Sequence, residues 1–164
     1  MDINEILTTR ASKINFLKGL IRLAKCDGNL DEEEFKFYQQ AAYSMQLNDE
    51  DVEELNKTWN RSEKISLTFA SSKEKMFFLI QAVQLCWVDN EYTEIEKKEM
   101  QVIAEELGID RQALKKVEEW VYEGVEWNRR GEELLSLQEK KLSRTEYAIE
   151  LAKSINNDIR EALN

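Results

Sequence analysis

Four acidic residues recur in the same arrangement at two places in the chain. Asp27 precedes Glu34 by seven residues, and Asp89 precedes Glu96 by the same interval. Carboxylate oxygens are the ligands that hard cations such as Ca²⁺ and Mg²⁺ prefer in proteins. If the two acidic segments meet in the fold, the carboxylates repel one another, and a divalent cation (calcium, magnesium or manganese) relieves the repulsion. The sequence therefore raises the hypothesis of a metal site formed by Asp27, Glu34, Asp89 and Glu96.

Helix capping is the alternative explanation for the same acidic residues. Asp31 is a suitable N-cap with Glu34 at the third helical position, and Thr93 with Glu96 forms the two ends of a capping box. The two aspartates would then serve only to fix their turns. Both explanations stay open on the sequence alone.

An EF-hand calcium loop is excluded by its register. With Asp27 and Gly28 at loop positions five and six, Glu34 falls on position twelve, as a calcium loop requires. Positions one and three are then Leu23 and Lys25, and the second acidic segment also lacks carboxylates there. The similarity covers half a loop and does not provide the calcium ligands.

The two acidic segments belong to a longer internal repeat with an offset of 62 residues. No gap is needed between about residues 16 and 56, so the copies span about 13–57 and 75–119. Each copy predicts an apolar helix (13–26 or 74–88), an acidic turn, a second helix, a short turn and a third helix. The paired positions include Phe16 and Phe78, Leu17 and Leu79, Ile21 and Val83, Asp27 and Asp89, Glu34 and Glu96, and Ala42 and Ala104.

The composition favours an all-α fold. The chain has no proline and five glycines, and its apolar residues recur at helical spacing. We therefore expect a compact bundle of about seven to eight helices with an internal pseudo-two-fold repeat. The segment 74–88 is apolar all round, so we place it at the centre of the bundle. The predicted core contains Phe16, Leu20, Ala42, Phe78, Val83, Leu85 and Ile103.

Two segments lie outside the repeat. Residues 59–72 are expected to form a short helical or irregular bridge between the copies. The run Arg129-Arg130-Gly131 interrupts the last helical pattern, so we expect a helical domain over 1–130. The remaining residues, 131–164, show apolar residues at helical spacing and are expected to form an amphipathic extension packed on the same domain.

The net charge of −10 limits the partners that the protein can bind. A nucleic-acid backbone or an anionic membrane surface would be repelled, and the densest basic run is only two residues. A protein partner, in particular a basic one, or cations would suit the charge. No apolar run is long enough to insert into a membrane.

Catalytic function has little support in the sequence. The chain has no histidine to act as a general base, and Cys26 and Cys86 fall in apolar helical segments that predict buried, reduced thiols. The N-terminus lacks the plan of a signal peptide. We therefore expect a non-enzymatic, cytoplasmic protein with no cofactor other than a divalent cation.

The acidic turn and its second copy resemble the TerB-like family, which is named for tellurite resistance. The residues that carry the resemblance are Leu23, Ala24, Asp27, Gly28, Leu30, Glu34, Asp89, Tyr92, Thr93 and Glu96. The resemblance spans about residues 12–127, and it departs from the pattern where Asn90 takes the place of Gly28 in the second copy. It implies an all-helical fold of about seven helices, a role in bacterial stress-response or membrane-linked assemblies, and a divalent-metal site at the acidic residues.

Two functions remain as expectations. The first is a non-enzymatic TerB-like scaffold or sensor in a bacterial stress-response pathway. The second is an acidic helical protein that blocks a partner, such as an immunity protein or an antitoxin, for which the negative charge is the active feature.

Overall fold

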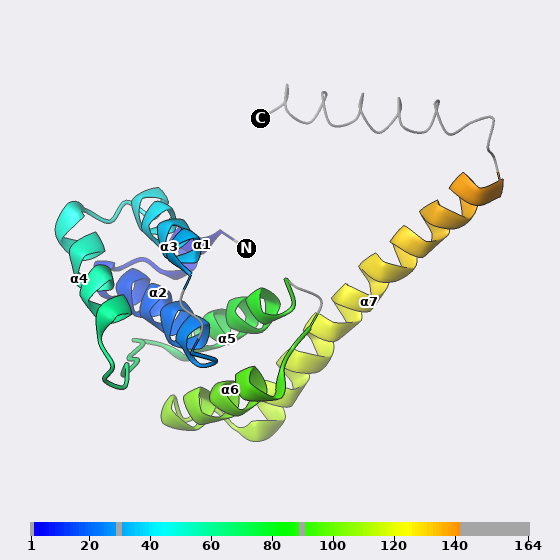
Figure 1. Cartoon of the computed structure of the whole chain (residues 1–164). Helices are drawn as coiled ribbons and strands as arrows, with labels where there is room; N and C mark the ends of the chain where they lie inside the picture. Colours follow the sequence, from blue (N-terminus) through cyan, green and yellow to red (C-terminus); the bar gives the residue numbers. More distant parts are fainter. Residues whose placement is uncertain (1, 29–30, 89–90, 142–164) are drawn as a thin grey trace. The chain divides into compact units, whose positions relative to one another are not determined.

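The computed structural model describes residues 2–28, 31–88 and 91–141, and within them the chain forms seven α-helices and no strand (Figure 1). The all-α prediction is therefore confirmed. The helices are α1 (Ile3–Ile6), α2 (Arg10–Lys25), α3 (Glu32–Ser44), α4 (Asp49–Asn60), α5 (Ser72–Cys86), α6 (Glu94–Glu106) and α7 (Arg111–Lys141). The chain divides into two compact units, Met1–Tyr122 and Glu123–Asn164, so only the first turns of α7 belong to the helical bundle.

The helix boundaries follow the 62-residue frame. Helices α2 and α5 begin at equivalent positions, α3 and α6 match at both ends, and α4 and α7 begin at equivalent positions. The residues that cap these helices are also equivalent, because Thr9 corresponds to Ser71 and Asp31 corresponds to Thr93. In each case the side-chain oxygen accepts a hydrogen bond from a backbone N–H of the first turn, which is a donor that the helix itself leaves unpaired.

The C-terminal ends of α3 and α6 are fastened to the bundle in the same way. The Lys13 ammonium donates a hydrogen bond to the carbonyl of Met45 (2.8 Å), and the equivalent Lys75 ammonium donates one to the carbonyl of Leu107 (2.9 Å). A cation at the C-terminus of a helix satisfies a carbonyl that has no partner within the helix and lies at the negative end of the helix dipole. The two copies therefore share tertiary contacts as well as helix boundaries.

Equivalent residues of the two copies contact each other at the centre of the bundle. The Ser12 hydroxyl donates a hydrogen bond to the Glu74 carboxylate (2.9 Å), and the rings of Phe16 and Phe78 meet edge to face with centroids 6.1 Å apart. Each of these pairs is 62 residues apart, and contact between equivalent positions is what a two-fold arrangement produces. Around this point α2 packs against α3, α4, α5 and α6, while α5 packs against α1, α2 and α6.

The predicted core is largely buried. The buried members are Phe16, Leu20, Ala42, Phe78, Val83 and Ile103, each with at most 8 % of its surface exposed. Leu85 is the exception, since it is only half-buried and lies at the edge of a groove described below. The placement of 74–88 at the bundle centre is therefore correct for one side of α5 and wrong for the side that carries Leu85.

The expected interruption at Arg129-Arg130-Gly131 is wrong, because α7 continues through it to Lys141. A glycine inside a helix costs about 1 kcal/mol relative to alanine, which does not end a helix that is otherwise favourable. Arg129 forms ion pairs with Glu126 (2.9 Å) and with Glu133, one turn before it and one turn after it. The amphipathic pattern expected beyond residue 141 lies outside the described residues.

Candidate functional site

The structure supports capping for one of the predicted metal ligands, Glu96, and for its neighbour Thr93. Thr93 and Glu96 form a complete capping box, in which the Glu96 carboxylate accepts from the Thr93 N–H (2.9 Å). Asp31 caps α3, as expected, by accepting from a backbone N–H in the first turn. Glu34 does not complete a second box, because its carboxylate instead accepts a hydrogen bond from the Tyr38 hydroxyl (3.1 Å). The capping explanation is therefore right for Glu96 and wrong in its detail for Glu34.

Acidic residues of both copies act on the same thiol at the end of α2. Burial, followed by the nearby charges of Asp27 and Glu96, raises the pKa of Cys26 to about 11. Burial and the charge of Glu96 raise the pKa of Cys86 to about 12. Both cysteines are thus free, protonated thiols near neutral pH, and such thiols are poor nucleophiles and poor metal ligands.

The four-carboxylate metal site stays a prediction. Asp89, the third of the four predicted ligands, lies outside the described residues. Asp27 is exposed on the turn after α2, and no three His, Cys, Asp or Glu side chains within the described part of the chain form a group that could hold a metal ion.

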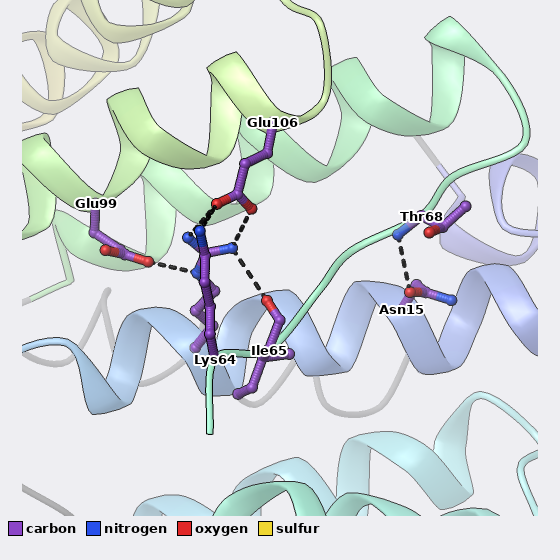
Figure 2. A network of polar contacts seen from close by, with 7 residues as sticks. Asn15, Lys64, Ile65, Thr68, Glu99 and Glu106 are labelled. Atoms are coloured by element: carbon purple, nitrogen blue, oxygen red, sulfur yellow. Dashed lines mark hydrogen bonds and ion pairs between the residues drawn. The ribbon is translucent and has the colours of Figure 1, made fainter. Parts of the chain in front are cut away.

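A buried arginine joins the two copies on one side of the bundle (Figure 2). Arg22 of α2 has 6 % of its side chain exposed and donates to Glu99 of α6 (2.5 Å), to Glu106 of α6 (2.6 Å) and to the carbonyl of Ile65 (3.1 Å). Lys64 forms a further ion pair with Glu106. Hydrogen bonding to Arg22 is the main cause that lowers the pKa of Glu106 to about 2. We call these residues the Arg22 network.

An apolar groove lies between α1, α2, α3 and α5. It has a volume of about 510 Å³, and most of its lining is aliphatic or aromatic. Its polar lining consists of Tyr38, Ser44, Gln81 and Gln84, and no lining residue carries a charge at neutral pH. Two large apolar side chains at its edge are exposed, Phe37 by 57 % and Val88 by 69 %. A second hollow of about 840 Å³ between α3 and α4 is lined by polar and charged residues, so it resembles ordinary solvated surface.

The groove and the Arg22 network occupy equivalent places in the two copies. In the 62-residue frame, Gln84 corresponds to Arg22, while Phe37 and Ser44 correspond to Glu99 and Glu106. Helix α2 therefore packs against α6 through ion pairs, whereas α5 has no comparable packing against α3.

Comparison with known proteins adds no assignment to this geometry. No protein-family model, curated protein or solved structure matches the chain. The likeness to the TerB-like family accordingly stays a prediction from the acidic-turn motif. No helix in the described part of the chain is both long enough and apolar enough to cross a lipid bilayer.

The sequence did not predict the groove or the Arg22 network. One signal for the network was present, since Arg22 is a charged residue within the apolar run Leu20 to Leu23. A charged side chain in such a position needs partners when it is buried. The sequence carries no signal for the groove, because helical spacing identifies an apolar face but does not identify which neighbour fails to cover it.

Proposed function

We propose that the chain is a non-enzymatic, TerB-like helical module that binds a protein partner, as a scaffold or sensor in a bacterial stress response. The apolar groove is the observation that carries this proposal. Its volume of about 510 Å³ lies in the range of ligand-binding pockets, and exposed apolar surface with a polar surround is typical of interaction sites. The surrounding chain is strongly acidic, so the uncharged groove is a distinct surface on the bundle.

The polar side chains in the groove support binding rather than catalysis. Burial and the neighbouring Glu34 raise the pKa of Tyr38 far above its ordinary value, so its phenol stays protonated near neutral pH. Gln81 and Gln84 do not titrate, and their amides can donate and accept hydrogen bonds. These groups can recognise a ligand, and none of them is suited to accept a proton in a reaction.

The TerB-like part of the proposal rests on the acidic turns. Gly28 has a φ of +79°, a backbone conformation that a glycine adopts readily and that suits the turn after α2. Asp27 lies at this turn, and the charges of Asp27 and Glu96 both raise the pKa of the Cys26 thiol at the end of α2. The stress-response role follows from the family resemblance alone.

The acidic partner-blocker is the second candidate, and the net charge of −10 favours it. Such a protein would bind a basic partner through its acidic surface instead of through the groove. Binding through exposed charges weakens as the ionic strength rises, whereas binding in an apolar groove does not. The salt dependence of partner binding therefore distinguishes the two candidates.

Site-specific photo-crosslinking in the native host tests the proposal. A photoreactive amino acid replaces Phe37 at the groove, and the matched control replaces Ile95 on α6, which is exposed to a similar extent (57 % and 52 %). We expect one discrete protein adduct from position 37, the same protein in replicate preparations, and none from position 95. Equal labelling at both positions contradicts the proposal, and an adduct that is lost at high salt favours the acidic candidate.

A further inference from the structure

The long helix α7 carries a row of large apolar side chains on its surface. Trp127 is 76 % exposed, the highest value among the large apolar side chains of the described residues, and Leu134 is 66 % exposed. Trp120, two turns before Trp127 in the same helix, is 54 % exposed. The three residues are spaced by seven, so they lie on one face of the helix. A row of exposed apolar side chains is typical of an interaction surface.

Two glycines alternate with these side chains on the same face. Gly124 and Gly131 follow the two tryptophans at the four-residue spacing that places residues above one another on a helix. A glycine inside a helix costs about 1 kcal/mol relative to alanine. A Cβ added at either glycine would meet no other part of the described chain within 4 Å, so packing within that part does not require them. Without side chains, these two positions allow a bulky group from another molecule to approach α7 closely.

A second copy of the same face matches this pattern in shape. When two α7 helices lie antiparallel with Trp127 of one copy opposite Gly124 of the other, the same register places Trp120 opposite Gly131. Two-fold symmetry repeats both pairs, so each of the four tryptophans faces a glycine. Such an arrangement is the packing of knobs into holes found in coiled coils. A parallel pair in register would instead place each tryptophan against its own equivalent.

The charges beside the row are complementary in the same antiparallel register. Glu123 and Arg130 each precede one of the glycines, so both flank the row on the same side, and both are exposed. Glu123 of one copy then lies beside Arg130 of the other, and the symmetry produces this pair twice. A shift by seven residues in either direction would bring Arg130 against Arg130 or Glu123 against Glu123. Flanking charges of this kind determine the orientation and register of paired helices.

We infer that the chain forms an antiparallel homodimer through α7, in which the tryptophans of each copy pack on the glycines of the other. The self-complementarity of one helix face, in shape and in charge, carries this inference. The surface is separate from the groove, so the inference goes beyond the proposed function and does not depend on it.

The area available for this contact predicts a weak dimer. A tryptophan buries about 150–250 Å² when it is fully covered. With exposed fractions of 54 % and 76 % in each of two copies, the tryptophans lose about 400–650 Å², and the surfaces that they cover lose a similar area. The total reaches about the lower end of specific interfaces, which is near 1,200 Å². We therefore expect a dissociation constant in the micromolar range.

Analytical ultracentrifugation of the full chain, from low micromolar to near-millimolar concentration, tests the inference. Gly124→Ala and Gly131→Ala are the deciding variants, because alanine favours an isolated helix but fills the space opposite a tryptophan. Ser136→Ala is the matched control, since it is an exposed position on the opposite face of α7 where alanine only raises the helix propensity. Circular dichroism establishes that each variant folds.

We expect the native chain and Ser136→Ala to dimerise alike. Each glycine variant should weaken the dimer by about tenfold or more, while its helix content stays the same or rises. Opposite effects on the helix and on the dimer would not arise from a glycine that has only a structural role within one chain.

Reversal of the flanking charges tests the register. Glu123→Arg and Arg130→Glu should each weaken the dimer at low salt, because each places like charges side by side. The double variant Glu123→Arg/Arg130→Glu exchanges the two charges and should restore the dimer. Failure of this restoration would overturn the antiparallel register and the inference with it.

Two other results would also overturn the inference. One is a chain that stays monomeric at every concentration, whether the face is bare, covered by residues 142–164 or reserved for a different protein. The other is a dimer that the glycine variants leave intact, and its dissociation by Val88→Glu would place the contact at the groove instead. Photo-crosslinking at position 37 remains a separate measurement, because neither result changes the adduct expected there.

Discussion

Replacing Arg22 by glutamine gives α2 the residue that α5 carries at the equivalent position, Gln84, in the lining of the groove. The change removes the donors to Glu99, Glu106 and the Ile65 carbonyl, at 2.5, 2.6 and 3.1 Å. Removing one partner of a fully buried ion pair costs about 3–5 kcal/mol. Here the side chains of Glu99 and Glu106 are 24 % and 28 % exposed to solvent, and Lys64 still pairs with Glu106 in the variant. Water and Lys64 therefore compensate in part, and we expect a loss of about 2–3 kcal/mol.

Urea unfolding followed by tryptophan fluorescence measures this loss as a shift of the midpoint at constant slope. Arg111→Gln is the matched control, because Arg111 pairs with Glu105 at 2.8 Å while both side chains are mostly exposed. Exposed pairs contribute little, so this variant should leave the urea midpoint essentially unchanged.

A double-mutant cycle with Glu99→Gln separates the ion pair from simple packing. We expect a coupling energy between Arg22 and Glu99 of about 1 kcal/mol or more. If Arg22→Gln costs no more than Arg111→Gln, the network does not fasten the two copies together. If the single variant is costly but the coupling is zero, the loss comes from the aliphatic stem of Arg22 rather than from its charge.

Four other predictions follow from the core, the network and the acidic turns. Phe78→Ala should cost about 3–5 kcal/mol in urea melts, since Phe78 is fully buried, and a loss below about 1 kcal/mol would show that its burial is misjudged. Gly19→Ala should cost about 1–3 kcal/mol despite its better helix propensity, because the new Cβ would lie 2.3 Å from the Phe78 ring; a neutral or stabilising effect would contradict that contact. The pKa of Glu106 is about 2 in the folded chain against an ordinary 4.5, so its contribution is complete above about pH 4.5 and is lost as the pH falls toward 2; acid melts of Glu106→Gln should lack this component. If the acidic turns bind a cation, millimolar calcium, magnesium or manganese should raise the Tm of the native chain but not of Asp27→Asn/Asp89→Asn, and an unchanged native Tm would refute the metal site.

The parts of the fold that depend on local chemistry were predictable from the sequence. Asp31 and Thr93 satisfy backbone donors within their own first turns, so their residue types alone marked the starts of α3 and α6. The 62-residue offset made Phe16 and Phe78 equivalent, and their apolar stripes assigned both to the core, where the structure brings the two rings together. Each of these predictions needed only neighbouring residues or the repeat itself.

The features that the sequence analysis missed or misjudged depend on which of several possible contacts a residue makes. Glu34 has the right spacing for a capping box, yet the Tyr38 hydroxyl one turn later is its partner. Glycine is a residue type that often ends a helix, yet Gly131 lies inside the continuous helix α7. Arg129 of the same helix forms ion pairs with Glu126 and Glu133. The groove depends on Gln84, which is shorter than its equivalent Arg22 and carries no charge. The sequence alone does not show which helix faces this position, so it does not predict the groove.

The contact between Ser12 and Glu74 bears on how a duplicated chain can change. In a symmetric dimer of single copies, a residue on the two-fold axis meets an identical residue, so a glutamate there would face a second glutamate. Two buried carboxylates at hydrogen-bond distance repel each other unless one binds a proton. In the tandem chain the axial pair is a hydroxyl donor and a carboxylate acceptor, 2.9 Å apart and both buried. Fusion of the copies therefore permits a hydroxyl–carboxylate pair at the axis, which two identical residues of a homodimer cannot form.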